Sequence, residues 1–293
     1  MEIFGVPSAL LGSQLLVGLI NGSFYAILSL GLAIIFGLLN IINFAHGAQY
    51  MMGAFVAWIA LNKLGINYWV ALLFAPIVIG ALGVVIERTM LRKLYKLDHL
   101  YGLLLTFGLA LIFEGIFRDQ YGISGQSYPV PELLQGGVNL GFMFLPIYRG
   151  WVVVAALTVC FATWFIIEKT KLGAYLRAGT ENPQIVQALG INVPLLITFT
   201  YGFGVALAAF AGVLAAPVYQ VNPLMGANLI IVVFAVVVIG GMGSIMGSIL
   251  TGLGLGLIEG LTRVFYPEAS AVVVFVIMVI VLLVRPAGLF GKA

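Results

Sequence analysis

The chain has 293 residues, of which 62% are hydrophobic and only 8% are charged. Soluble domains are typically about 45–50% apolar and about 25% charged. A soluble fold of this length could not cover its surface with 13 basic and 10 acidic side chains. The composition therefore indicates an all-α polytopic membrane protein, which we expect to form one domain over residues 1–293.

Several classes of function are excluded by the same composition. The net charge is only +3 and the basic residues are scattered, which argues against a nucleic-acid partner. The single cysteine, Cys160, permits neither a disulfide framework nor a thiolate metal site. We predict no catalytic residue, metal ligand or cofactor. The first basic residue is Lys63, so the first apolar stretch lacks the basic start of a cleavable signal peptide and is expected to be a retained span.

A helix needs about 20 mostly apolar residues to cross a bilayer. In chain order, such runs cover roughly 10–38, 48–62, 68–88, 100–117, 149–167, 194–216, 228–246, 248–264 and 270–285. This pattern predicts nine membrane helices. Eight is equally defensible, because neighbouring runs such as 228–246 and 248–264 touch.

Orientation follows from the basic residues, which concentrate in cytoplasmic segments. Nine of the thirteen fall in the segments 87–99 and 168–193 and in the tail. They are Arg88, Arg92, Lys93, Lys96, Lys169, Lys171, Arg177, Arg285 and Lys292. We assign these segments to the cytoplasm, which makes the N-terminus external. The long segment at about 119–148 is then external, as either a connector or a docking surface for a partner.

Small residues repeat every four positions at Gly252, Gly256 and Gly260, and also at Gly18 and Gly22. Such faces let helices approach closely in lipid. Packing within the chain is the favoured interpretation, and self-association is the alternative.

Two carboxylates lie four residues before an arginine: Glu114 before Arg118, and Glu259 before Arg263. On a helix this spacing brings the charges together. A charge at membrane depth is a functional hypothesis by default. Both pairs fall near the expected external ends of their spans, however, so a structural anchor is favoured over a role in gating or conduction.

Polar residues interrupt the apolar runs near the N-terminus. Asn21 breaks the first run, and Asn40, Asn43, His46 and Gln49 follow it. At such a break, polar side chains can line a water-filled path or satisfy helix termini. The residues leave both possibilities open.

The segment 168–193 predicts a helix of about two turns, isolated between two spans. Asn182 is a favourable N-cap, and Pro183 suits the first helical position. Gly190 is placed to end the helix in a left-handed conformation. The helix should present Ile185, Val186 and Leu189 on one side, against either the membrane or a groove on a cytoplasmic partner.

At this point the residues resemble a known family, the permease subunits of branched-chain amino acid ABC importers of the LivH type. The matching blocks are NGSFYAILSLGLAIIFGLLNIINFAHGAQYMMGA (21–54), LRAGTENPQIVQALGINV (176–193), VVVIGGMGSIMGSILTG (236–252) and RPAGLFG (285–291). The NFAHG block followed by the GGMGS block is the most specific part of the resemblance.

The resemblance implies a set of partners in the cell (inner) membrane. These are a second, similar permease chain, two cytoplasmic ATP-binding subunits and an extracytoplasmic solute-binding protein. The sequence itself has no Walker A loop, since its only Gly-Lys pair is Gly291–Lys292. A separate polypeptide would therefore hydrolyse ATP.

The resemblance also implies roles for individual residues. The short helix is similar to the coupling helix of importer permeases, and the residues concerned are Asn182, Pro183, Gln184, Ile185, Val186, Leu189 and Gly190. Gln184, Ile185 and Val186 replace the usual E-A-A, so docking would rely on the apolar face and the caps. The implied path residues, together with Asn21 at the first break, are Asn43, Phe44, His46, Gly47, Gly240, Gly241, Gly243 and Ser244.

The resemblance leaves the solute open. Similar permeases serve urea, short amides or other neutral amino acids. From the residues alone, a secondary transporter using Glu114 or Glu259 as a proton relay is a further alternative.

Overall fold

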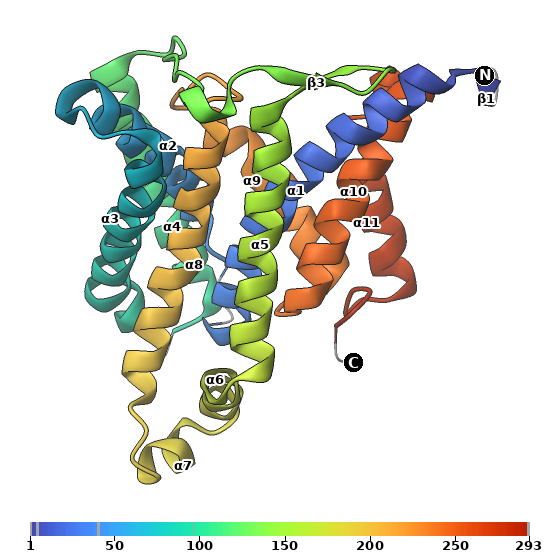
Figure 1. Cartoon of the computed structure of the whole chain (residues 1–293). Coiled ribbons are helices and arrows are strands. Elements are labelled where there is room, and N and C mark those ends of the chain that lie inside the picture. Colours follow the sequence, from blue (N-terminus) through green and yellow to red (C-terminus); the bar gives the residue numbers. More distant parts are fainter. Residues whose placement is uncertain (1, 4–5, 40–41, 96, 292–293) are drawn as a thin grey trace. The chain divides into compact units, whose positions relative to one another are not determined.

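The computed structural model describes residues 2–3, 6–39, 42–95 and 97–291. Asn40, Lys96 and Lys292 of the predictions above lie outside these residues. The described part is helical (Figure 1), with two short antiparallel strand pairs besides: β1 (Glu2–Ile3) with β2 (Val6–Pro7), and β3 (Gly137–Asn139) with β4 (Phe144–Pro146).

Each of the nine predicted segments overlaps a helix. These helices are α1 (Ser8–Leu39), α2 (Ala45–Leu64), α3 (Tyr68–Thr89), α4 (His99–Tyr121), α5 (Ile147–Lys169), α8 (Val193–Ala215), α9 (Met225–Gly240), α10 (Ile245–Phe265) and α11 (Val273–Val284). Within the described ranges, six of them are long and apolar enough to cross a membrane, namely α1, α3, α4, α5, α8 and α10. Two more, α9 and α11, are shorter apolar helices.

Two shorter helices lie between α5 and α8: α6 (Lys171–Glu181) and α7 (Pro183–Ala188). The predicted short helix is therefore present, but the prediction that it is isolated was wrong. Asn182 both ends α6 and caps α7. Three single turns of 3-10 helix, at Leu91–Lys93, Glu132–Leu134 and Pro267–Ala269, complete the described elements.

The chain divides into two compact units, each formed from separate stretches of sequence. Unit 1 comprises residues 1–29, 129–160 and 232–293, and unit 2 comprises residues 30–128 and 161–231. Helices α1, α5 and α9 each contribute residues to both units.

Unit 2 is built on the packing of α2, α3 and α8 (Figure 1). Small residues make this possible. A Cβ added at Gly53 of α2 would collide with the main chain of Ala209 in α8, and one at Gly212 would collide with that of Tyr50. Close approach at small residues is the usual way that membrane helices associate.

In unit 1 the repeated glycines bring α1 against α10. A Cβ built on Gly18 would lie 2.5 Å from the carbonyl oxygen of Gly256, and one on Gly22 would lie 3.0 Å from that of Leu253. The small-residue face is thus used within the chain, as favoured above.

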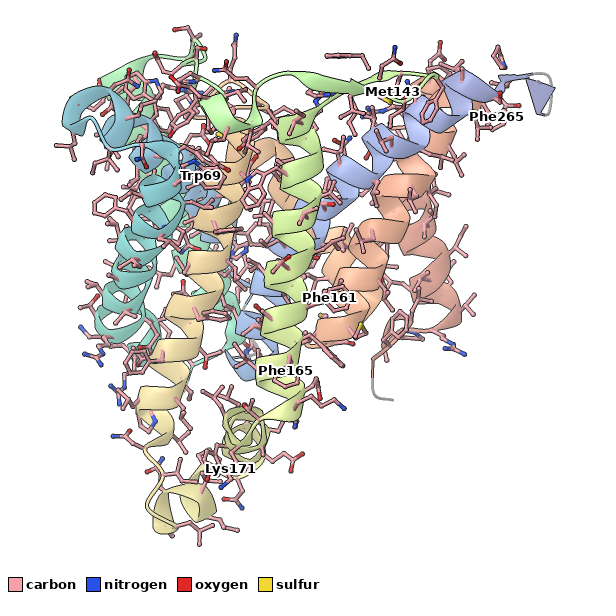
Figure 2. The ribbon with its side chains drawn as sticks, viewed as in Figure 1. Trp69, Met143, Phe161, Phe165, Lys171 and Phe265 are labelled. Carbon is pink, nitrogen blue, oxygen red and sulfur yellow. The ribbon has the colours of Figure 1, made fainter. Side chains whose placement is uncertain are left out.

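The outer surfaces of α4 and α5 are apolar. Phe161 and Phe165 lie one turn apart on α5 and point outward (Figure 2), with more than half of each side chain exposed. On α4 only Gly102, Thr106 and Leu109 are buried. Exposed apolar surface of this extent is what a lipid-facing helix requires.

Candidate functional site

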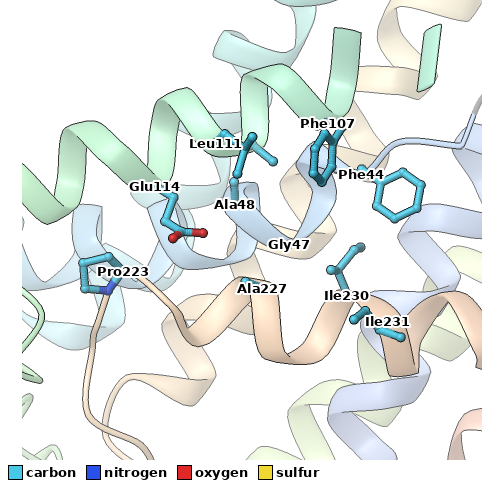
Figure 3. Close-up of a pocket in the computed structure, with 11 residues that line it drawn as sticks. Phe44, Gly47, Ala48, Phe107, Leu111, Glu114, Pro223, Ala227, Ile230 and Ile231 are labelled. Atoms are coloured by element: carbon cyan, nitrogen blue, oxygen red, sulfur yellow. The ribbon is translucent and has the colours of Figure 1, made fainter. Parts of the chain in front are cut away.

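Unit 2 contains an apolar pocket of about 250 Å³. Figure 3 shows that its walls come from the start of α2, the middle of α4 and the start of α9. The lining residues are Phe44, Gly47, Ala48, Phe107, Ala110, Leu111, Glu114, Pro223, Ala227, Ile230 and Ile231. Glu114 is the one charged member of this set. Apolar walls with few polar groups are typical of small-molecule sites.

The backbone that leads into the pocket is supported by Thr106 of α4. Its hydroxyl donates to the carbonyl of Ile42 (3.1 Å) and accepts from the N–H of Phe44 (3.2 Å). Thr106 is fully buried. Non-helical backbone at membrane depth needs such partners because lipid offers none. This residue was not predicted, since a lone threonine in an apolar helix gives no signal in the sequence.

Beside the pocket, two glycines let α2 and α9 approach each other closely. A Cβ added at Gly47 would lie 2.6 Å from the carbonyl oxygen of Gly226, and one at Gly226 would collide with Gly47 in turn. Nearby, Gln126 and Val221 exchange backbone hydrogen bonds of 2.8 and 2.9 Å. This bridge ties the segment after α4 to the segment before α9.

The predicted polar residues Asn43 and His46 are fully buried and do not line the pocket, whereas Phe44 and Gly47 do. The amide of Asn43 donates to Oε1 of Gln49 at 3.1 Å. Within the described ranges, Oδ1 of Asn43 has no hydrogen-bond partner. Buried amides of this kind are costly unless a polar group or water reaches them. Their place on the path stays a prediction.

Glu114 and Arg118 form the predicted i,i+4 ion pair, with 3.6 Å between Oε1 and the guanidinium nitrogen. The side chain of Arg118 is 52% exposed and that of Glu114 is 21% exposed. In Figure 3 the carboxylate of Glu114 points into the space between α4 and α9. The pair is loose, since 3.6 Å exceeds hydrogen-bond distance.

Glu259 and Arg263 also pair, as predicted, but in a different setting. The guanidinium of Arg263 donates directly to Oε1 of Glu259, and the hydroxyl of Tyr25 donates to Oε2 at 2.7 Å. Glu259 is buried. Each oxygen of this carboxylate therefore has a hydrogen-bond partner within unit 1, and the role of the pair as an anchor stays a prediction.

The other predicted path residues form a tight turn in unit 1. Gly240 ends α9, Gly241 and Gly243 have φ of +98° and +84°, and Ser244 caps α10 by accepting from the N–H of Gly247 at 3.1 Å. Positive φ is tolerated best by glycine. Asn21 lies within α1. A role for these residues in the path stays a prediction.

The C-terminal segment closes this turn. The N–H groups of Leu289 and Phe290 donate to the carbonyls of Ile239 and Gly240 at 2.8 and 3.2 Å. These are carbonyls that the end of a helix leaves without partners. The GGMGS and RPAGLFG blocks, more than 40 residues apart in sequence, thus form one structural feature.

The caps of the short helix are confirmed. The side chain of Asn182 accepts from the N–H of Ile185 at 3.2 Å, Pro183 opens α7, and Gly190 has φ of +84°. Its apolar residues are divided, however. Val186 is buried, whereas Ile185 and Leu189 are 59% and 75% exposed. Of these three apolar side chains, Ile185 and Leu189 are therefore available to a partner, as is the exposed Gln184 beside them.

A buried carboxylate that was not predicted lies at the end of α3. Glu87 is 1% exposed and accepts hydrogen bonds from Tyr95 (2.7 Å) and from Thr198 of α8 (2.6 Å). Burial, and then the hydrogen bond to Glu87, raises the pKa of Tyr95. Glu87 is the first residue of the segment 87–99, whose basic residues predict only that it is cytoplasmic.

Comparison with known proteins agrees with the resemblance noted in the sequence. A family described as "Branched-chain amino acid transport system / permease component" matches residues 14–282. The high-affinity branched-chain amino acid transport system permease protein BraD of Pseudomonas aeruginosa is 34% identical, with 95% of each chain covered. LivH of Escherichia coli (strain K12), a permease protein of a system with the same description, is 30% identical at the same coverage. LivM of Salmonella typhimurium, another such permease protein, is 28% identical over 90% of this chain and 67% of its own length.

Proposed function

Since the chain belongs to the family of permease components of branched-chain amino acid transport systems, we propose that it is the membrane-spanning subunit of an ATP-binding-cassette importer. The solutes would be branched-chain, neutral hydrophobic amino acids moving into the cytoplasm. A permease component is a non-catalytic transport subunit. The chain is a multi-pass protein of the cell (inner) membrane.

The match over residues 14–282 carries this proposal. The names of BraD and LivH assign their systems to branched-chain amino acids with high affinity. The apolar pocket supports the same solute class, because urea and short amides offer little apolar surface to such walls.

The proposed partners are a second permease chain, two cytoplasmic ATP-binding subunits and an extracytoplasmic solute-binding protein. LivM supports the first, because this chain is similar to both LivH and LivM. The lack of a Walker A loop in the sequence supports the second.

The proposed orientation puts the segments 87–99 and 168–193 and the tail in the cytoplasm, with eight or nine spans. In this arrangement α7 is the coupling helix, and the exposed Ile185 and Leu189 dock on an ATP-binding subunit. The hairpin of β3 and β4 then belongs to the external segment at about 119–148, on the side of the solute-binding protein.

Purification of the tagged chain from native membranes in mild detergent provides the first test. We expect ATP-binding subunits and a second permease to co-purify. The complex is then placed in liposomes with ATP inside and the solute-binding protein outside, and uptake of labelled leucine is measured. Uptake should require ATP, and isoleucine and valine should compete whereas urea and acetamide should not.

Two other results would contradict the proposal. Leucine uptake that follows a pH gradient without ATP would indicate a secondary transporter. ATP-driven uptake in which urea or a short amide replaces leucine would assign the system to a different solute.

A further inference from the structure

We infer that the pocket between α2, α4 and α9 binds the zwitterion of a branched, apolar amino acid: Glu114 takes the ammonium group, Arg118 the carboxylate, and the apolar walls the side chain. This inference rests on the proposed function and adds to it a binding site within the permease itself.

The first argument is the size and chemistry of the walls. An apolar cavity of about 150 Å³ is known to hold benzene. The present pocket, at about 250 Å³, has room for the smaller side chain of leucine, isoleucine or valine. Phe44, Phe107 and Ile230 provide apolar contact surface around this space (Figure 3).

The second argument is the placement of charge. The two charged groups of an α-amino acid are separated by a single carbon atom. A ligand whose ammonium group contacts Glu114 therefore brings its carboxylate within reach of Arg118, because the two side chains lie 3.6 Å apart. Arginine suits this role because its planar donors match a carboxylate.

The third argument is a comparison between two pairs with the same sequence spacing. Glu259 is buried, and each of its oxygens accepts a direct hydrogen bond, from Arg263 and from Tyr25. Glu114 makes only the loose contact with Arg118, and no side-chain hydrogen bond of either residue is found in the described part of the chain. A half-exposed pair of this kind is weak, so opening it for a ligand costs little.

Cysteine labelling of the assembled transporter in liposomes tests the inference. Cys160, the chain's one cysteine, is buried and is first replaced by Cys160→Ala. Ala227→Cys then places a thiol on the pocket wall at an exposed position. The rate of its reaction with N-ethylmaleimide is measured with and without L-leucine. At ten times its dissociation constant, bound leucine should slow the reaction about tenfold.

Two analogues separate the charged contacts from apolar filling. The anion 4-methylpentanoate lacks the ammonium group, and the cation 3-methylbutylamine lacks the carboxylate. Each should protect the thiol much less than leucine at the same concentration. Equal protection by all three compounds would overturn the inference, because it would indicate a pocket for any apolar chain, such as a lipid tail.

Glu114→Gln and Glu132→Gln form a matched pair of variants in the labelling background. Glu132 is an exposed carboxylate outside the pocket, so its variant should keep full protection by leucine. Glu114→Gln should still be labelled at the unprotected rate, which reports a folded pocket, but should lose most of the protection. Full protection in Glu114→Gln would reject the proposed ammonium contact.

Leucine uptake in the same liposomes separates this inference from the proposed function. ATP-driven uptake without protection of the thiol would reject the pocket assignment and leave the function standing. Protection without ATP-driven leucine uptake would support the pocket and reject the function. If neither is observed, both are rejected.

Discussion

The hydroxyl of Tyr25 donates a hydrogen bond of 2.7 Å to Glu259, a residue 234 positions further along the chain. The bond joins α1 to α10 on the faces where the glycines of the two helices meet. Arg263 holds the second oxygen of the same carboxylate. This arrangement gives Glu259 the contacts of a structural anchor and guides the first prediction.

Glu259→Gln should leave ATP-driven leucine uptake largely intact, because the amide keeps an oxygen that can accept from Tyr25. Glu259→Leu removes both acceptor oxygens, so the hydrogen bonds from Tyr25 and Arg263 are lost at a cost of about 1–3 kcal/mol. Thermal unfolding in detergent, followed by size-exclusion chromatography, should show the leucine variant as the less stable of the two. Complete loss of uptake in a well-expressed glutamine variant would instead give Glu259 a role in conduction.

The glycines of α10 allow a matched test of helix packing. A Cβ added at Gly256 would collide with Gly18 and Gly22, whereas one at Gly254 would meet nothing within 4 Å. Gly256→Ala should therefore sharply reduce the yield of monodisperse protein, and Gly254→Ala should leave it unchanged. Similar yields would show that α1 and α10 can separate without harm.

Much of the helical framework could be predicted because each span is a long apolar run with polar residues at its ends. Local signals also succeeded where one residue decides the geometry. Asn182 and Gly190 cap α7 as expected, and both i,i+4 ion pairs form. These features depend on neighbours within one turn of a helix.

Features that depend on tertiary burial could not be predicted. Thr106 and Glu87 look like ordinary residues until α4 and α3 are packed against other segments. The pocket illustrates the same limit. Phe44, Gly47 and Glu114 stand out in the sequence by motif or by charge, whereas Ala227 and Ile230, at the start of an apolar stretch, carry no such signal.

The short helix α7 gives a test of partner docking. Ile185→Asp with Leu189→Asp places two charges on its exposed apolar positions and should abolish co-purification of the ATP-binding subunits, because burying unpaired carboxylates is costly. The chain should still insert and run as a monodisperse species, since neither side chain is buried. Gln187→Asp adds a charge to the same helix at an exposed position outside the proposed docking set and should retain the partners. Undiminished co-purification with the double variant would contradict docking through α7.

The buried carboxylate of Glu87 leads to the last prediction. Thr198→Val keeps the shape of the side chain but removes the hydroxyl that donates to Glu87 at 2.6 Å. The nearby Thr200 is a matched control. Both hydroxyls contact a carbonyl one turn earlier in α8, that of Pro194 at 3.0 Å or that of Leu196 at 2.8 Å, and the hydroxyl of Thr198 also reaches Glu87. Thr198→Val should destabilise the protein by about 1–3 kcal/mol, the cost of an unsatisfied buried group, and Thr200→Val by clearly less. Because Thr198 lies only five residues after the first residue of α8, we expect the loss to loosen the junction between α7, α8 and α3. Comparable melting temperatures for the two variants would mean that the bond to Glu87 contributes little to this junction.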